Sequence, residues 1–150
     1  MDFGIVYKPG FTLVGIPLRA SWSSLLTERP KAWQHWFARM NEVKARSGRA
    51  SMEASLAMQE GEYFQLVGAP VLAADDIPDD MLCVEIPQKH YVYAEHKGPV
   101  ETIPAQFDAM TQWAHTQGHK VSDFRLDMGY LPKGNETHHQ LYIEILDAPA

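Results

Sequence analysis

The chain contains the same succession of sequence patterns twice, and this duplication constrains its fold more than any other feature. Each copy predicts a strand, a helix and two further strands. One such unit alone would leave an apolar sheet face exposed, so we expect two similar half-domains that pack together, with a ligand site at the seam between them. The segments are 11–22, 29–45, 51–59 and 62–71 in the first copy, and 90–101, 103–117, 122–132 and 139–148 in the second.

The two expected helices share a proline near their start and an apolar stripe along one side. Pro30 and Pro104 occupy equivalent places, where a residue without an N–H fits the first helical turn. Thr102 is placed to cap the second helix, and Gly118 is placed to end it. Apolar residues recur at three- and four-residue spacing, which predicts helices half-buried against a sheet. The stripes are Trp33, Trp36, Phe37, Met40 and Val43 in the first helix, and Phe107, Met110, Trp113 and Ala114 in the second.

The strands of the second copy alternate between two kinds of residue. This period of two predicts that each strand turns one face towards the helices and the other face away from them. One face is apolar, and the other mixes aromatic rings with carboxylates and amides, which makes it the more suggestive face for binding. Tyr91, Tyr93 and Glu95 share a face in one strand, Gln140, Tyr142 and Glu144 in another, and Arg125 and Asp127 in a third.

The connection between the copies, residues 69–81, holds two prolines and four aspartates and reads as a solvated loop. A boundary between two domains is the alternative. Each domain would then have about 70 residues and be poorly stable alone. We therefore expect a single domain over 1–150, with one repeat at about 1–70 and the other at about 82–150.

Composition and charge exclude several classes of function. The net charge is −6, and the densest basic stretch, Lys44, Arg46 and Arg49, is typical of a solvated helix end. No apolar run approaches the roughly 20 residues of a membrane span, and no signal peptide is visible. The single cysteine, Cys83, lies in an apolar run and is expected to be buried. We expect a cytoplasmic protein without nucleic-acid or membrane partners.

Residues 91–119 read YVYAEHKGPVETIPAQFDAMTQWAHTQGH, an aromatic strand that ends in a Glu-His-Lys-Gly-Pro turn before a helix headed by Ile-Pro. The turn is 95–99, the helix head is Ile103-Pro104, the helix carries Trp113, and Ile86, Pro87 and Tyr91 precede them. This pattern resembles the GyrI-like, or AraC-type, effector-binding domain of the SOUL-like superfamily. That family also supplies the drug-binding domain of some MerR-type multidrug regulators, and the similarity covers nearly the whole chain.

The resemblance implies an α+β fold in which duplicated βαββ units form a curved antiparallel sheet with two main helices and a central ligand cleft. It also implies a small hydrophobic ligand, often aromatic and cationic. By position, Asp127 and Tyr142 match acidic and aromatic residues of the family's last two strands, whereas Gln140 replaces an acid. Glu144, two residues after Tyr142 on the same face, is expected to supply the missing charge. The family's regulators carry a DNA-binding domain in front, so this chain resembles the stand-alone members, some of which are mobile gene cassettes.

The predicted site therefore combines flat aromatic rings, whose negative faces favour cations, with acidic groups. For each residue a plain structural role is the alternative: the tryptophans as helix core, the tyrosines as strand packing and the acids as exposed charges. The candidate ligand-binding residues are Trp33, Trp36, Tyr91, Tyr93, Trp113, Asp127, Gln140, Tyr142 and Glu144.

No catalytic residues, cofactor or metal are expected. His115 and His119 have helical spacing, but Gly118 separates them, and the adjacent His138 and His139 are expected to be solvated. A hydrolase of reactive small electrophiles is the main alternative function, with Tyr142 and a nearby carboxylate as acid and base. A protein-binding inhibitor is a third, and a protein partner or a homodimer stays open.

Overall fold

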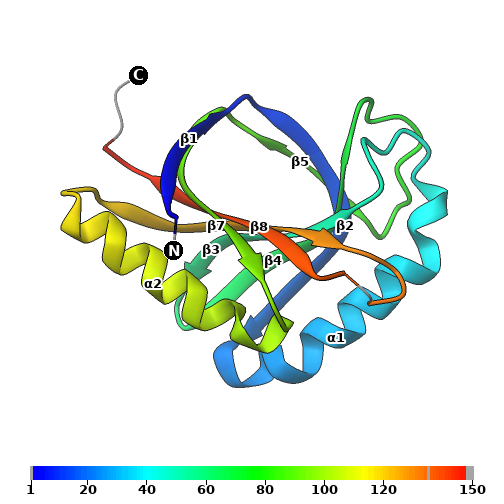
Figure 1. The fold of residues 1–150 in the computed structure, drawn as a ribbon. Helices are drawn as coiled ribbons and strands as arrows, with labels where there is room; N and C mark the ends of the chain where they lie inside the picture. The colour runs from blue at the N-terminus through cyan, green and yellow to red at the C-terminus, as the bar shows by residue number, and fades with distance from the viewer. Residues whose placement is uncertain (1, 135, 148–150) are drawn as a thin grey trace.

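The structure is a computed structural model that describes residues 2–134 and 136–147. Over these residues the chain forms a curved, antiparallel, eight-stranded sheet with two long helices on one side (Figure 1). The strand order is β1-β6-β8-β7-β3-β4-β2-β5. The elements are β1 (Gly4–Lys8), β2 (Phe11–Ser21), α1 (Trp22–Arg39), the 3-10 turn η1 (Met40–Glu42), β3 (Ser51–Gln59), β4 (Glu62–Val71), β5 (Leu82–Ile86), β6 (Lys89–Lys97), the 3-10 turn η2 (Val100–Thr102), α2 (Ile103–Thr116), β7 (Val121–Tyr130) and β8 (His138–Ile145).

Two copies of a strand–helix–strand–strand unit build the sheet, so the predicted α+β class and the duplication are confirmed. The first copy is β2, α1, β3 and β4, and the second is β6, α2, β7 and β8. They meet where β3 pairs with β7, with Glu53 opposite Asp127. The outer strands are exchanged, because β1 pairs with β6 and β5 pairs with β2. The spatial halves therefore differ at their edges from the sequence halves 1–70 and 82–150.

The first helix begins earlier than the sequence pattern predicts. It starts at Trp22, directly after β2, because the Ser21 side chain accepts a hydrogen bond from the Ser24 N–H and caps the helix. Pro30 therefore lies inside the helix and not in its first turn. It is exposed, so water can reach the backbone carbonyl that proline leaves without a donor. The helix ends at Arg39 and not at 45.

The second helix agrees with its prediction more closely. Pro104 lies in the first turn of α2, and Gly118, with φ +83°, follows its end in the left-handed region that glycine tolerates. The expected side-chain cap does not form. The Thr102 hydroxyl instead donates to the carbonyl of Pro99, over 2.6 Å.

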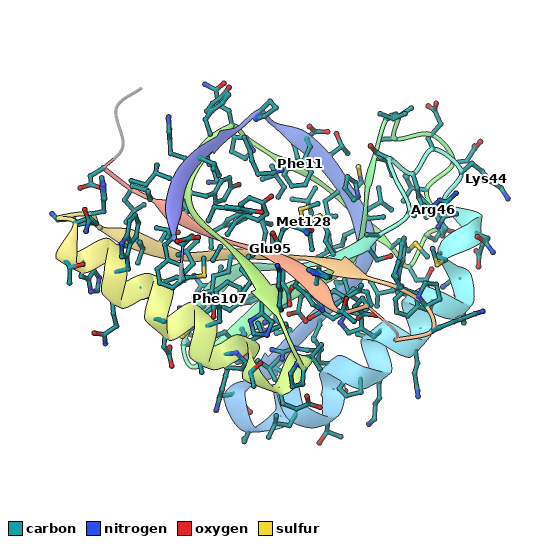
Figure 2. All side chains as sticks on the ribbon, in the orientation of Figure 1. Phe11, Lys44, Arg46, Glu95, Phe107 and Met128 are labelled. Atoms are coloured by element: carbon teal, nitrogen blue, oxygen red, sulfur yellow. The ribbon has the colours of Figure 1, made fainter. Side chains whose placement is uncertain are left out.

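Three apolar clusters make up the core of the described residues. One lies between α1 and the first half of the sheet, and one between α2 and the second half. The third lies on the face opposite to the helices, where β1 and β5 rise from the sheet (Figure 1). Figure 2 labels Phe11 and Met128 on that side and Phe107 beside α2. The third cluster consists of Leu13, Met52, Ala54, Leu66, Ile86, Tyr91, Phe124, Leu126 and Tyr142, with Phe11 and Tyr93 packed against it.

One prediction about exposure and one about the end of the first helix are wrong. Cys83 is exposed, because β5 is an edge strand whose alternate residues, Val84 and Ile86, point inwards in its place. Lys44 and Arg46 do not end the first helix but follow it in an irregular segment, at the right of Figure 2. None of the helices in the described ranges is long and apolar enough to cross a membrane.

Candidate ligand-binding face

Five of the nine predicted site residues share the sheet face opposite to the helices. We call this the aromatic face, because it carries Phe11, Tyr91, Tyr93, Phe124 and Tyr142. In the register, Glu144 stands opposite Tyr91, and Tyr142 stands opposite both Tyr93 and Leu126. The predicted residues that the structure brings together here are Tyr91, Tyr93, Gln140, Tyr142 and Glu144.

The other four predicted residues lie on the helix side. Asp127 stands opposite Leu141, which packs under α2, so it points away from Tyr142 and Glu144. The expected grouping of these acids in one cleft is therefore wrong. Trp36 is fully buried and donates to the Ser51 hydroxyl over 2.8 Å. Trp33 stacks on Tyr130 at 4.3 Å between ring centroids, and Trp113 packs against Phe3 at 6.0 Å.

The tyrosines of the aromatic face form one contact network. The Tyr142 ring lies 5.5 Å from Tyr91 and 5.1 Å from Tyr93, and Tyr91 lies 6.3 Å from Phe124. Tyr91 is fully buried, and its hydroxyl has no hydrogen-bond partner among the described residues. Burial raises the pKa of Tyr91 well above its ordinary value, and Glu144 and Tyr142 add to the shift. A neutral hydroxyl without a partner is costly to bury.

Glu144 is a largely buried carboxylate of this face and is bonded on both oxygens. The Lys89 ammonium lies 2.5 Å from one oxygen, and the Ser122 hydroxyl donates to the other over 2.7 Å. The side chains are only 19% and 17% exposed for Glu144 and Lys89, so water screens the pair weakly. The same ammonium lies 4.8 Å from the centre of the Phe124 ring. The carboxylate and the ring thus hold one cation together.

A second lysine lies beside the first. Lys8 of β1 stands opposite Lys89 in the register, and its ammonium lies 4.9 Å from the centre of the Tyr142 ring and 6.0 Å from that of Phe11. Burial lowers the pKa of Lys8. Like charges directly opposite each other in a sheet repel. The rings and Glu144 are the groups here that offset this repulsion.

A pocket of about 480 Å³ opens at the edge of β6, beyond the end of β1. Tyr93 belongs both to this pocket and to the aromatic face, so the two adjoin. Glu95, labelled in Figure 2, is exposed and lines the pocket. The pocket lies in the second half and not at the seam between the halves. Its lining residues are Asp2, Phe3, Tyr93, Ala94, Glu95, His96, Lys97 and Gln106.

A second set of charged residues is buried on the helix side, at the centre of the sheet. Asp127 accepts hydrogen bonds from the Tyr130 hydroxyl and, over 2.8 Å, from Nδ1 of His139. Glu53, opposite Asp127 in the register, lies 2.9 Å from Nε of Arg29 on α1. We call this set the buried polar cluster; it consists of Arg29, Glu53, Asp127, Tyr130, Glu136 and His139.

Charges in the buried polar cluster are strongly coupled. Burial raises the pKa of Glu53 to about 7; Arg29 acts to lower it, and Asp127 adds to the rise. Burial acts to lower the pKa of His139, but the hydrogen bond and charge of Asp127 outweigh it, and the net shift is upward. His139 is only 1% exposed, so the prediction that it is solvated is wrong. Both oxygens of Asp127 are bonded internally, which leaves it little to offer a ligand.

Several residues of the aromatic face were missed from the sequence. Lys89 precedes Tyr91 by two residues, so the strand alternation alone places it on the face. Phe124 alternates with Arg125 and Asp127 in its strand, so the assignment of those two residues to the binding face left Phe124 out of the predicted site. Lys8 gave no signal, because β1 was not expected as a strand. No group of three or more His, Cys, Asp or Glu side chains suited to a metal ion occurs in residues 2–134 and 136–147.

The curved sheet, its two helices and the aromatic face define the class of this chain: an α+β protein with the GyrI-like effector-binding fold, as expected from the sequence. Residues 4–146 match the family described as Cass2, integron-associated effector binding protein, and the chain belongs to that family. By class it is a small-molecule-binding protein. No curated protein matches the chain.

Solved structures share the fold at low sequence identity. SAV2435 bound to tetraphenylphosphonium has a TM-score of 0.76 at 13% identity, over 98% of this chain and 95% of that one. An integron cassette protein from the mobile metagenome of Vibrio cholerae has a TM-score of 0.69 at 9% identity, over 95% of each chain. A hydrolase from Listeria innocua has a TM-score of 0.61 at 11% identity, over 96% and 91%. At such identities the likeness establishes the fold alone.

Proposed function

We propose that this protein binds small amphipathic aromatic compounds on the aromatic face, with a preference for cations. The observation that carries the proposal is the placement of two ammonium groups on its rings, Lys8 over Tyr142 at 4.9 Å and Lys89 over Phe124 at 4.8 Å. The face already places ammonium groups over aromatic rings, and a cationic ligand would make the same contact.

The energies of these contacts favour selection by charge and by shape. A cation over an aromatic ring gains about 0.5–2 kcal/mol, most when water is excluded. Glu144 is largely buried and adds a direct charge interaction. The unpartnered hydroxyl of Tyr91 offers a further polar contact. Gln140, which replaces an acid of the family pattern, leaves Glu144 as the carboxylate that carries the preference.

The pocket at Tyr93 supports an approach to this face from the edge of β6. Its volume of about 480 Å³ is within the range of small-molecule sites. Tyr93 contacts Tyr142 at 5.1 Å, so a ligand with several rings can occupy the pocket and reach towards the tyrosine network. SAV2435, with a lipophilic cation bound on the same fold, supports this class of ligand for the present chain.

Calorimetric titration with tetraphenylphosphonium tests the proposal. Trp33, Trp36 and Trp113 lie on the helix side, so heat is a better readout than tryptophan fluorescence. We expect saturable binding to the wild type and at least about tenfold weaker binding to Tyr142→Leu, which keeps an apolar side chain but removes the ring. The matched control is Tyr7→Leu, because Tyr7 is 52% exposed on β1. Absence of saturable heat at millimolar probe would refute the proposal.

Turnover is the competing function. The Listeria innocua hydrolase shares the fold, but in this chain both oxygens of Glu144 are bonded to Lys89 and Ser122, and Asp127 lies on the other side of the sheet. We therefore propose binding without a chemical step. Mass spectrometry of the bound compound after prolonged incubation is expected to recover it unchanged, and a product that Glu144→Gln abolishes would favour the enzyme.

A further inference from the structure

Lys89 occupies the place on the aromatic face that a ligand cation would take. Its ammonium contacts the Glu144 carboxylate and faces the Phe124 ring at once. We propose that Lys89 is a built-in competitor, which a cationic ligand must displace from Glu144 in order to bind. This proposal rests on the function proposed above and names the residue that sets the charge preference of the same face.

The surroundings of Lys89 distinguish it from an ordinary surface ion pair. The pair of Lys31 with Glu28 on α1 has side chains 64% and 43% exposed, whereas Lys89 and Glu144 are 17% and 19% exposed. A weakly hydrated pair interacts strongly and is costly to leave half-made. A ligand that removes Lys89 from Glu144 must therefore bring a positive charge of its own. A neutral ligand has no such replacement to offer.

The position of Lys89 makes the exchange feasible. It is the first residue of β6 and lies directly opposite Lys8 on the short edge strand β1. Release of the Lys89 side chain towards solvent also relieves its repulsion with Lys8. The exchange therefore swaps one cation for another at Glu144, and the net charge buried on the face stays the same.

Two consequences follow for specificity. In the wild type, competition with Lys89 weakens the binding of cations, whereas the positive charges of Lys8 and Lys89 strengthen the binding of anions. Without the Lys89 charge, Glu144 is left unpaired, so cations are favoured and anions are repelled. Lys89 thus reduces the difference in binding affinity between cationic and anionic ligands of the same shape.

The test uses two probes of similar shape and opposite charge, tetraphenylphosphonium and tetraphenylborate, in calorimetric titrations of the intact chain. For Lys89→Met we expect about tenfold tighter binding of the phosphonium and about tenfold weaker binding of the borate. The matched control is Lys31→Met on α1, because Lys31 lies on the helix side in an exposed ion pair with Glu28 and its loss changes the net charge equally. It is expected to leave both affinities within about twofold.

The outcomes separate this inference from the proposed function. Phosphonium binding to the wild type that Lys89→Met leaves unchanged overturns the competitor role but preserves the binding face. Absence of phosphonium binding in the wild type and in Lys89→Met overturns both. Should Lys89→Met fail to fold, Lys89→Gln removes the charge but keeps a donor for Glu144, and the same shifts are expected. In the double variant with Glu144→Gln, the gain in phosphonium affinity must vanish; a gain that persists also overturns the inference.

Discussion

The two faces of the sheet each bury a carboxylate that is bonded on both oxygens, yet the two carboxylates differ in what holds them. On the helix side, Asp127 receives hydrogen bonds from His139 and Tyr130, and α1 covers the neighbouring charges. On the aromatic face, Glu144 is held by a lysine at the start of an outer strand. The first carboxylate is enclosed by its own network, whereas the second has a partner that can leave. A buried carboxylate indicates a binding face only where its partner can give way to a ligand.

The largest expected effect is a loss of stability when the buried carboxylate of the helix side is replaced by an amide of the same shape. Asp127→Asn is expected to cost about 3 kcal/mol of unfolding free energy, because the amide has one acceptor oxygen and leaves either His139 or Tyr130 without its acceptor in the interior. The melting temperature should fall by roughly 6–12 °C, as expected for a chain of this length. Urea unfolding measures the free energy directly.

The control for this variant is Asp123→Asn on the same strand. Asp123 is exposed, so the loss is expected to stay below about 0.5 kcal/mol. A loss for Asp127→Asn as small as that of the control would mean that the buried polar cluster is not the tightly held network described above.

A smaller effect depends on pH and concerns Glu53. Its folded-state pKa of about 7 lies above the value of 4.5 for an exposed glutamate, so the folded protein holds a proton that the unfolded chain has lost. Stability contributed by this proton is present below about pH 4.5 and is lost as pH rises through about 7. His139, with its pKa also raised, loses stability in the same direction above its ordinary value of 6.5.

Glu53→Gln removes the pH-dependent contribution of Glu53 to stability and keeps that of His139. We expect the variant to be more stable than the wild type by about 1–3 kcal/mol at pH 8 and to differ by less than about 0.5 kcal/mol at pH 4.5. Unfolding curves at several pH values check this. A variant that loses stability at pH 8 would show that the contact with Arg29 outweighs the cost of burying the charge.

The sequence predicted the local part of this arrangement and missed the non-local part. Alternation within one strand placed Tyr91 with Tyr93, and Tyr142 with Glu144, because the period of two is a property of the chain alone. The face on which Asp127 lies depends on how β7 aligns with β8, and a shift of one residue reverses it. Alternation put Asp127 with Arg125 on the polar face of its strand, and family position put it in the cleft. Both assignments fail because the apolar face of β7, with Phe124 and Leu126, packs in the third cluster and not under the helices.

The missed elements have equally physical causes. β1 has only five residues, and its partner β6 lies some 80 positions away in the sequence. No local sequence pattern therefore indicates that Lys8 belongs to the site. α1 follows β2 without a break, and the internal Pro30 has the appearance of a first-turn proline. The exposure of Cys83 follows from the edge position of β5, which the apolar run around it does not reveal.

The smallest expected change in stability, that of Glu144→Gln, is also the most direct test of the difference between the two faces. Glu144→Gln carries the same chemical change as Asp127→Asn, but its partner Lys89 can turn to solvent and Ser122 can still donate to the amide oxygen. We expect a stability loss of about 1 kcal/mol, because the released Lys89 ammonium can reach water and is not left unpaired in the interior, together with at least about tenfold weaker binding of tetraphenylphosphonium. Thermal unfolding and calorimetry on the same sample measure both. A loss of stability as large as that of Asp127→Asn would mean that Glu144, like Asp127, serves the fold and not a ligand.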